Sequence, residues 1–160
     1  MPVEPGTYLA EKGHIKTIPP AETTLVMDKK RRILQALAPA PIFAGKGWLE
    51  AKGEKSPNVV ASNAPEFYLR LTKEERFGII RLKPEKGIRI VEKVAVIPTT
   101  KEILEEMDQV ETFRRQLGEG LYKIWPMKPL SPGEYAVVEY TPAETEGITM
   151  QTWDFSVPAK

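Results

Sequence analysis

Fifteen prolines are spread along the whole chain, from Pro2 to Pro158, and eleven glycines lie between them. Proline lacks a backbone N–H and cannot continue a helix or a central strand, so prolines tend to mark the ends of elements. The chain of 160 residues is therefore expected to fold into many short elements rather than a few long helices. At this length we expect one domain, residues 1–160, with 41% hydrophobic residues to supply its core.

Alternating apolar and polar residues, together with runs of β-forming residues, predict that most of these elements are strands. The candidate strand segments are residues 7–10, 14–18, 23–27, 47–51, 59–62, 66–72, 77–83, 88–97, 121–125, 134–141 and 149–157. Roughly eight to ten short strands in hairpin order favour an antiparallel β-sandwich. In the last strand, Trp153 and Phe155 alternate with Asp154, which predicts one core face and one wet face. Residues 52–58 are polar and are predicted to form a mobile loop.

One substantial helix is predicted around residues 100–117, and Thr99 is its expected N-terminal cap. Thr99 and Glu102 have the spacing of a capping box, and Gly118 can end the helix. The apolar residues that share one face at helical spacing are Ile103, Leu104, Met107, Val110, Phe113 and Leu117. The alternative is a shorter helix that ends near Gln109, because β-branched residues follow it. A second, short helix is predicted within residues 28–38, although four cations in its first turn would oppose the helix dipole.

Two counts exclude several classes of site. The chain has no cysteine and one histidine, which excludes disulfide scaffolds, zinc fingers, cysteine nucleophiles and any site that needs two histidines. A serine–histidine–aspartate triad would have to use His14, which lies in a predicted hairpin far from any nucleophile motif. No Walker, Rossmann or EF-hand motif is present, so we expect no metal and no cofactor. Glu139 and Asp154 are the candidates for a catalytic carboxylate pair, but ion pairing or solvation is the simpler role, and we expect no enzyme.

The charge pattern favours proteins over nucleic acids as partners. Lys and Arg number 23 and Asp and Glu 22, so the net charge is +1, and a dedicated nucleic-acid binder usually has a large basic excess. The basic run Lys29, Lys30, Arg31 and Arg32 is a candidate partner-binding site; the alternative is a solvated turn. No stretch is long and apolar enough to predict a transmembrane segment, and the first residues lack the features of a signal peptide.

Three tryptophans are candidates for a ligand platform. Trp153 alternates with Phe155 on the predicted core face, so we expect it to be buried. Trp125 precedes a proline, and Trp48 lies in a short predicted strand. Exposed aromatic rings can stack on sugars or dock proline-rich peptides, so Trp125 and Trp48 are the candidate ligand-binding residues.

Several strands resemble those of uncharacterised bacterial β-rich domains. The motifs that support the resemblance are Phe67-Tyr68-Leu69-Arg70, Pro132-Gly133-Glu134-Tyr135-Ala136 and Trp153-Asp154-Phe155. The resemblance covers residues 7–157 and implies a β-rich module associated with the cell envelope or secreted. It implies no catalytic residues, and a cytoplasmic location is the alternative.

Together these observations predict a non-enzymatic structural or interaction module, a subunit of a larger assembly that binds protein partners or itself. Strand edges and proline-rich extended segments would supply its binding surfaces. The alternative is a module that binds carbohydrate or peptide through an exposed tryptophan. Few Asn, no Cys and many Glu, Lys and Pro are also typical of thermophilic proteins.

Overall fold

The computed structural model describes residues 2–27, 31–35, 45–72, 76–100, 102–141 and 149–159, the second of these ranges as backbone only. Strands account for about 65% of the described residues, which contain no helix. The fourteen strands are β1 (Gly6–Glu11), β2 (His14–Ile18), β3 (Thr23–Met27), β4 (Arg31–Gln35), β5 (Gly45–Lys52), β6 (Glu66–Arg70), β7 (Arg76–Glu85), β8 (Ile88–Val96), β9 (Ile103–Glu106), β10 (Asp108–Val110), β11 (Thr112–Gly118), β12 (Leu121–Pro126), β13 (Gly133–Tyr140) and β14 (Met150–Val157).

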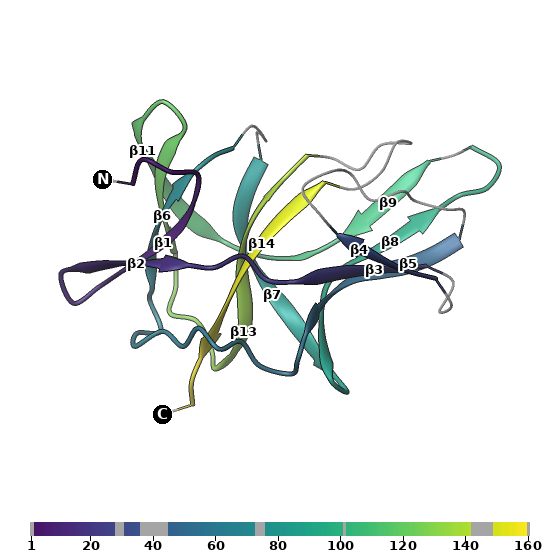
Figure 1. Cartoon of the computed structure of the whole chain (residues 1–160), viewed down its shortest axis with the longest axis horizontal. Helices are drawn as coiled ribbons and strands as arrows, with labels where there is room; N and C mark the ends of the chain where they lie inside the picture. The colour runs from purple at the N-terminus through teal and green to yellow at the C-terminus, as the bar shows by residue number, and fades with distance from the viewer. Residues whose placement is uncertain are drawn as a thin grey trace.

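The strands form two antiparallel sheets. One has five strands in the order β11-β12-β6-β1-β2. The other has nine strands, in the order β14-β13-β7-β8-β5-β3-β4, with β10 paired to β7 and β9 paired to β8. Figure 1 shows β7, β13 and β14 in the middle of the molecule, with the five-stranded sheet on one side and the rest of the larger sheet on the other.

The strands β7, β13 and β14 form a wall that is buried on both faces. Alternate residues of β13 enter different cores: Tyr135 and Val137 lie in one cluster, and Ala136 and Val138 in the other. Core 1 fills the space between the wall and the five-stranded sheet and contains Leu9, Ile18, Val60, Phe67, Leu69, Phe77, Ile79, Ile124, Leu130, Tyr135, Val137, Trp153, Phe155 and Val157. Core 2 lies inside the curl of the nine-stranded sheet and contains Leu25, Met27, Leu49, Ala51, Ile80, Leu82, Val91, Val94, Ala136, Val138 and Met150.

Because the wall is buried on both faces, the prediction of a water-exposed face on the last strand is wrong. Thr152, Asp154 and Ser156 of β14 point away from core 1, yet all three are buried. A strand in a two-layer sandwich exposes one face to water, whereas β14 has protein on both sides. Its outer edge is also covered, because Val59 forms a parallel bridge to Ser156 and the Ala21 N–H donates to the Thr152 carbonyl.

The predicted substantial helix at 99–117 is wrong, and with it the prediction of a sandwich that contains such a helix. This segment forms β9, β10 and β11. Strands β7 and β8 pair near their shared turn, from Lys83↔Ile90 to Glu85↔Ile88, and then diverge. Strand β9 pairs with the free part of β8, and β10 with the free part of β7, so the segment fills the opening between them.

Long-range strand pairing therefore overrides the local helical pattern of this segment. The residues of the expected helical face do not share one buried side, because Leu104, Phe113 and Leu117 are all exposed. The capping-box region forms a loop instead, in which the Glu102 N–H donates to Thr100 Oγ1 and the Ile97 N–H donates to the Glu102 carbonyl.

The short helix predicted within residues 28–38 is also wrong where the structure describes it. Residues 31–35 form β4, which pairs with β3 from Met27↔Arg31 to Thr23↔Gln35. The rest of that predicted helix lies outside the described residues. By contrast, both predicted hairpins are confirmed: β1 pairs with β2, and β7 with β8.

Candidate functional site

The clearest exposed apolar surface lies on β11 and β12. Phe113, Leu117 and Met127 expose 47%, 37% and 46% of their surfaces. Phe113 is paired with Trp125, and the Met127 N–H donates to the Glu111 carbonyl, which continues the same pairing by one step. Alternate residues of a strand share a face, so Phe113, Trp125 and Met127 lie on the side away from core 1. We call these three residues and Leu117, at the end of β11, the β11–β12 face.

The ring of Trp125 is held in place by its neighbours. Its centroid lies 5.8 Å from that of Phe113, with the two rings tilted by 38°. The Lys123 Nζ lies 5.5 Å from the Trp125 centroid and 2.5 Å from Glu66 Oε1. The predicted ligand-binding residue Trp125 therefore forms part of an aromatic pair with a cation beside it.

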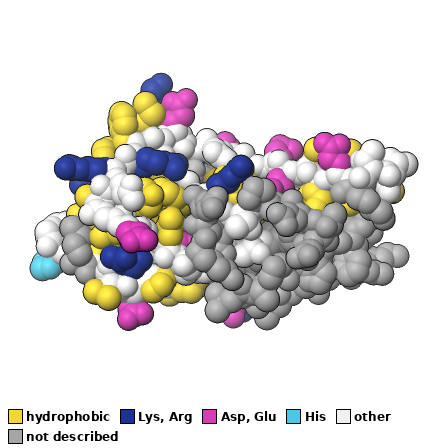
Figure 2. Space-filling model, turned by 90° about the horizontal axis from the view of Figure 1, so that it is seen from above, with side chains coloured by type: hydrophobic (Ala, Val, Ile, Leu, Met, Phe, Trp, Pro, Cys, Tyr) yellow, Lys and Arg dark blue, Asp and Glu magenta, His cyan; other side chains and the backbone are white. Residues whose placement is uncertain are grey.

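β11 is also an edge strand of the five-stranded sheet, whose other edge is β2. Six of its seven residues are exposed, so the strand is open on both faces as well as along its outer edge. An uncovered edge presents backbone N–H and C=O groups that can pair with another strand. Figure 2 shows apolar and Lys or Arg side chains interspersed over the end of the molecule that holds this sheet.

Two arginines in the middle of β11 have different surroundings. The Arg114 Nη2 donates to the Phe77 carbonyl at 3.0 Å, and its Cζ lies 4.3 Å from the Phe77 ring centroid. Arg115 is exposed and is paired in register with Lys123, on the face that carries Trp125. Among the described residues, no carboxylate forms an ion pair with Arg115.

The second predicted ligand-binding residue, Trp48, lines a groove of about 920 Å³ between β5, β8 and β9. Its indole N–H donates to Glu50 Oε1 at 2.8 Å, which fixes the ring. The groove is lined by apolar residues, including Ile90, Ala95 and Leu104, and by charged residues, including Lys93 and Glu106. The structure thus places Trp48 and Trp125 on different sheets, and they do not form one site.

The predicted basic site is only partly described. Lys29 and Lys30 lie outside the described residues. Arg31 and Arg32 begin β4, where they pair with Met27 and Val26, but the structure describes their backbone alone.

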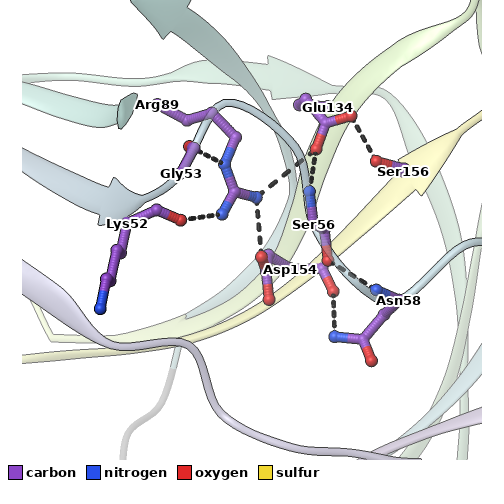
Figure 3. Close-up of polar contacts among 8 residues, drawn as sticks. All are labelled: Lys52, Gly53, Ser56, Asn58, Arg89, Glu134, Asp154 and Ser156. Carbon is purple, nitrogen blue, oxygen red and sulfur yellow. Dashed lines mark hydrogen bonds and ion pairs between the residues drawn. The ribbon is translucent and has the colours of Figure 1, made fainter. Parts of the chain in front are cut away.

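A buried charge cluster lies on the core 2 side of the wall, and the sequence analysis did not predict it (Figure 3). The guanidinium of Arg89 lies 2.7 Å from Asp154 Oδ2 and 3.5 Å from Glu134 Oε1. The same side chain donates to the carbonyls of Lys52 and Gly53, at 2.8 and 2.9 Å. Arg89, Asp154 and Glu134 are each at least 95% buried. One cation therefore joins β8, β13, β14 and the segment that follows β5.

The cluster fastens residues 53–58 to the wall. The Ser56 N–H donates to Glu134 Oε1 at 2.6 Å, and Ser156 Oγ donates to the other oxygen of that carboxylate. The Asn58 side chain donates to the Asp154 carbonyl at 3.1 Å. The mobility of residues 52–58 stays a prediction. The sequence signal that could have revealed the buried charge cluster is the alternation in β8, which puts Arg89 on the same side as the apolar Val91.

The two candidate catalytic carboxylates do not face one another. Asp154 is paired with Ala136, on the core 2 side of the wall. Glu139 lies three residues further along β13, on the opposite face, where it is fully buried and accepts the Thr72 N–H at 2.8 Å. Their positions on opposite faces of one sheet leave no space between them for a shared substrate.

Glu92 is a buried carboxyl whose pKa is strongly raised. It is 99% buried in β8, where a β-bulge interrupts the pairing with β5. Burial, and then the charge and carboxyl contact of Glu105 on β9, raise the pKa of Glu92 from 4.5 to about 8. Among the described residues, no group forms a hydrogen bond with either oxygen of the Glu92 side chain, so nothing offsets the cost of burying its charged form.

In the described part of the chain, no group of three or more His, Asp or Glu is arranged to hold a metal ion. The same part contains no helix that could cross a membrane. Comparison with protein-family models, curated proteins and solved structures gives no match. The resemblance to bacterial β-rich domains therefore stays a prediction.

Replacing Arg89 by Met should destabilise the protein strongly, because it leaves two buried carboxylates without their cation. The expected loss in the free energy of unfolding is about 3–5 kcal/mol, measured by urea denaturation at pH 7. The matched control is Lys83→Met, which removes an exposed ion pair to Glu85 and should cost less than about 1 kcal/mol. Equal losses in the two variants would contradict a structural role for the cluster.

Replacing Glu92 by Gln should stabilise the protein in a pH-dependent way. The folded-state pKa lies above the unfolded one, so the native chain loses stability as the pH rises from 4.5 to about 8. The variant should therefore match the native chain near pH 4.5 and exceed it at pH 8, by at most on the order of 4 kcal/mol. Urea midpoints at both pH values test this, with Glu106→Gln, an exposed carboxylate on β9, as the control. A gain that is equal at both pH values would rule out titration of Glu92 as the cause.

Proposed function

We propose that this chain is a non-enzymatic interaction module that binds an extended segment of a partner protein along β11. The partner would add a strand to the five-stranded sheet and lay its side chains on the β11–β12 face. The observation that supports this most directly is the coincidence of an open strand edge with exposed apolar residues on the same two strands. Backbone pairing would supply affinity, and the side-chain surface would supply specificity.

The composition of the β11–β12 face also supports a protein partner. Aromatic residues, Met and Arg are enriched at protein interfaces; this face contains Phe113, Trp125 and Met127, and Arg115 lies beside them on the same side of β11. Three of its apolar side chains are more than one-third exposed in the isolated chain. Burying them in a complex would remove apolar surface from water.

A second candidate function is the binding of a small ligand such as a carbohydrate in the Trp48 groove. Its volume of about 920 Å³ and its mixture of a fixed indole ring, apolar walls and charged rim are typical of ligand sites. We place it second because nothing in the groove selects one ligand chemistry.

Replacing Phe113 by Thr should discriminate between the two functions. Thr keeps the strand propensity of this edge but removes the aromatic partner of Trp125. Heptapeptides selected from a displayed random library on the native chain should lose at least about tenfold in affinity for the variant. N-methylation of their backbone should abolish binding, because it removes the donors for strand pairing.

The matched control is Leu104→Thr, which removes an exposed apolar side chain from the Trp48 groove. It should leave peptide binding unchanged. Peptides that lose affinity with Leu104→Thr and not with Phe113→Thr would contradict binding at β11 and favour the groove.

A further inference from the structure

Strand addition at β11 would place the partner's side chains opposite known residues. In paired strands, residues directly opposite each other share a face, and their side chains interact. On the face that carries Trp125, β11 presents Phe113 and then Arg115. A partner strand would therefore place one residue opposite an aromatic ring and, two residues along, another opposite an exposed guanidinium.

The charge of Arg115 determines which residue of a partner strand fits opposite it. Arg115 pairs in register with Lys123, whose amine is already neutralised by Glu66. No described carboxylate neutralises Arg115. Arg114, on the other face, already has the Phe77 carbonyl and ring as partners. Arg115 is therefore a cation on this edge that has no anionic partner among the described residues.

We propose that the partner segment recognised at β11 is an acidic extended strand with an Asp or Glu opposite Arg115 and an apolar residue two positions away, opposite Phe113. This inference rests on the proposed function and specifies the chemistry of its partner. An acidic residue opposite Arg115 would form a cross-strand ion pair, and an apolar residue opposite Phe113 would pack on the exposed ring.

A second copy of this chain fits the same edge poorly. Antiparallel pairing of two β11 strands about their middle would set Arg115 against Arg115, or Arg114 against Arg115, of the second copy. Like charges directly opposite each other destabilise a strand pair. The two arginines therefore protect the edge from self-pairing while they favour an acidic partner.

The test uses the full chain, labelled with ¹⁵N, and two synthetic probes. One is the acetylated and amidated heptapeptide Thr-Val-Thr-Glu-Thr-Val-Thr, whose symmetric pattern suits a parallel or an antiparallel approach. The other replaces its central Glu by Lys. The Glu peptide should shift the amide signals of β11 and the Trp125 indole signal, and should bind at least about fivefold more tightly than the Lys peptide.

Arg115→Glu should reverse this preference, so that the Lys peptide binds more tightly. Lys86→Glu, which makes the same change in net charge at the exposed β7–β8 turn, should leave the preference unchanged. Equal binding of both peptides at β11, or no reversal in Arg115→Glu, would overturn the acidic specificity and leave strand addition standing. Absence of shifts in β11 with either peptide at millimolar concentration would overturn both proposals. An oligothymidylate that shifts the β11 signals as strongly as the Glu peptide would also overturn the inference, since the edge would then recognise polyanions in general.

Discussion

The structure depends on a wall of three strands, β7, β13 and β14, that is buried on both faces. A strand of this kind must satisfy two cores at once, so its sequence cannot alternate simply between apolar and polar residues. The core 1 side of β13 and β14 is mostly apolar, whereas the core 2 side of β14 carries the buried polar residues Thr152, Asp154 and Ser156. Arg89 binds Asp154, and Ser156 binds Glu134, which Arg89 also contacts. Arg89 is the centre of that arrangement, because four of its five donors reach two carboxylates and two carbonyls.

The strand edges of the fold differ in whether other segments cover them. The outer edge of β14 is closed by Val59 and Ala21, and the divergence of β7 and β8 is filled by β9 and β10. The chain then leaves β10 and runs directly into β11, which has a partner on one side only. The chain therefore passes from β10, which pairs with a strand of the wall, into a strand with an uncovered edge. The exposed aromatic and cationic side chains of that strand are the basis of the proposed binding function.

Local sequence signals predicted the hairpins and most strands correctly, because alternation and turn residues act over a few positions. They failed at residues 99–117, where apolar residues at helical spacing are in fact divided between buried and exposed positions by pairing with β7, β8 and β12. They also failed for Asp154, because core 2 buries the side of β14 that carries this residue, and local sequence signals do not indicate a second core. Trp125 and Trp48 were identified from residue type alone. Their neighbours, Phe113 and Leu104, were assigned to the predicted helix, so neither surface could be assembled from the sequence.

Amide hydrogen exchange of the isolated, dilute chain, followed residue by residue by NMR, tests the account most directly. It predicts the slowest exchange in β13 and β14, whose amides open only with the whole fold, and fast exchange for the amides of β11 that do not bond to β12. Exchange in β11 that is as slow as in β12 would contradict an open edge. Exchange in β14 that is faster than in the five-stranded sheet would contradict a wall on which both cores depend.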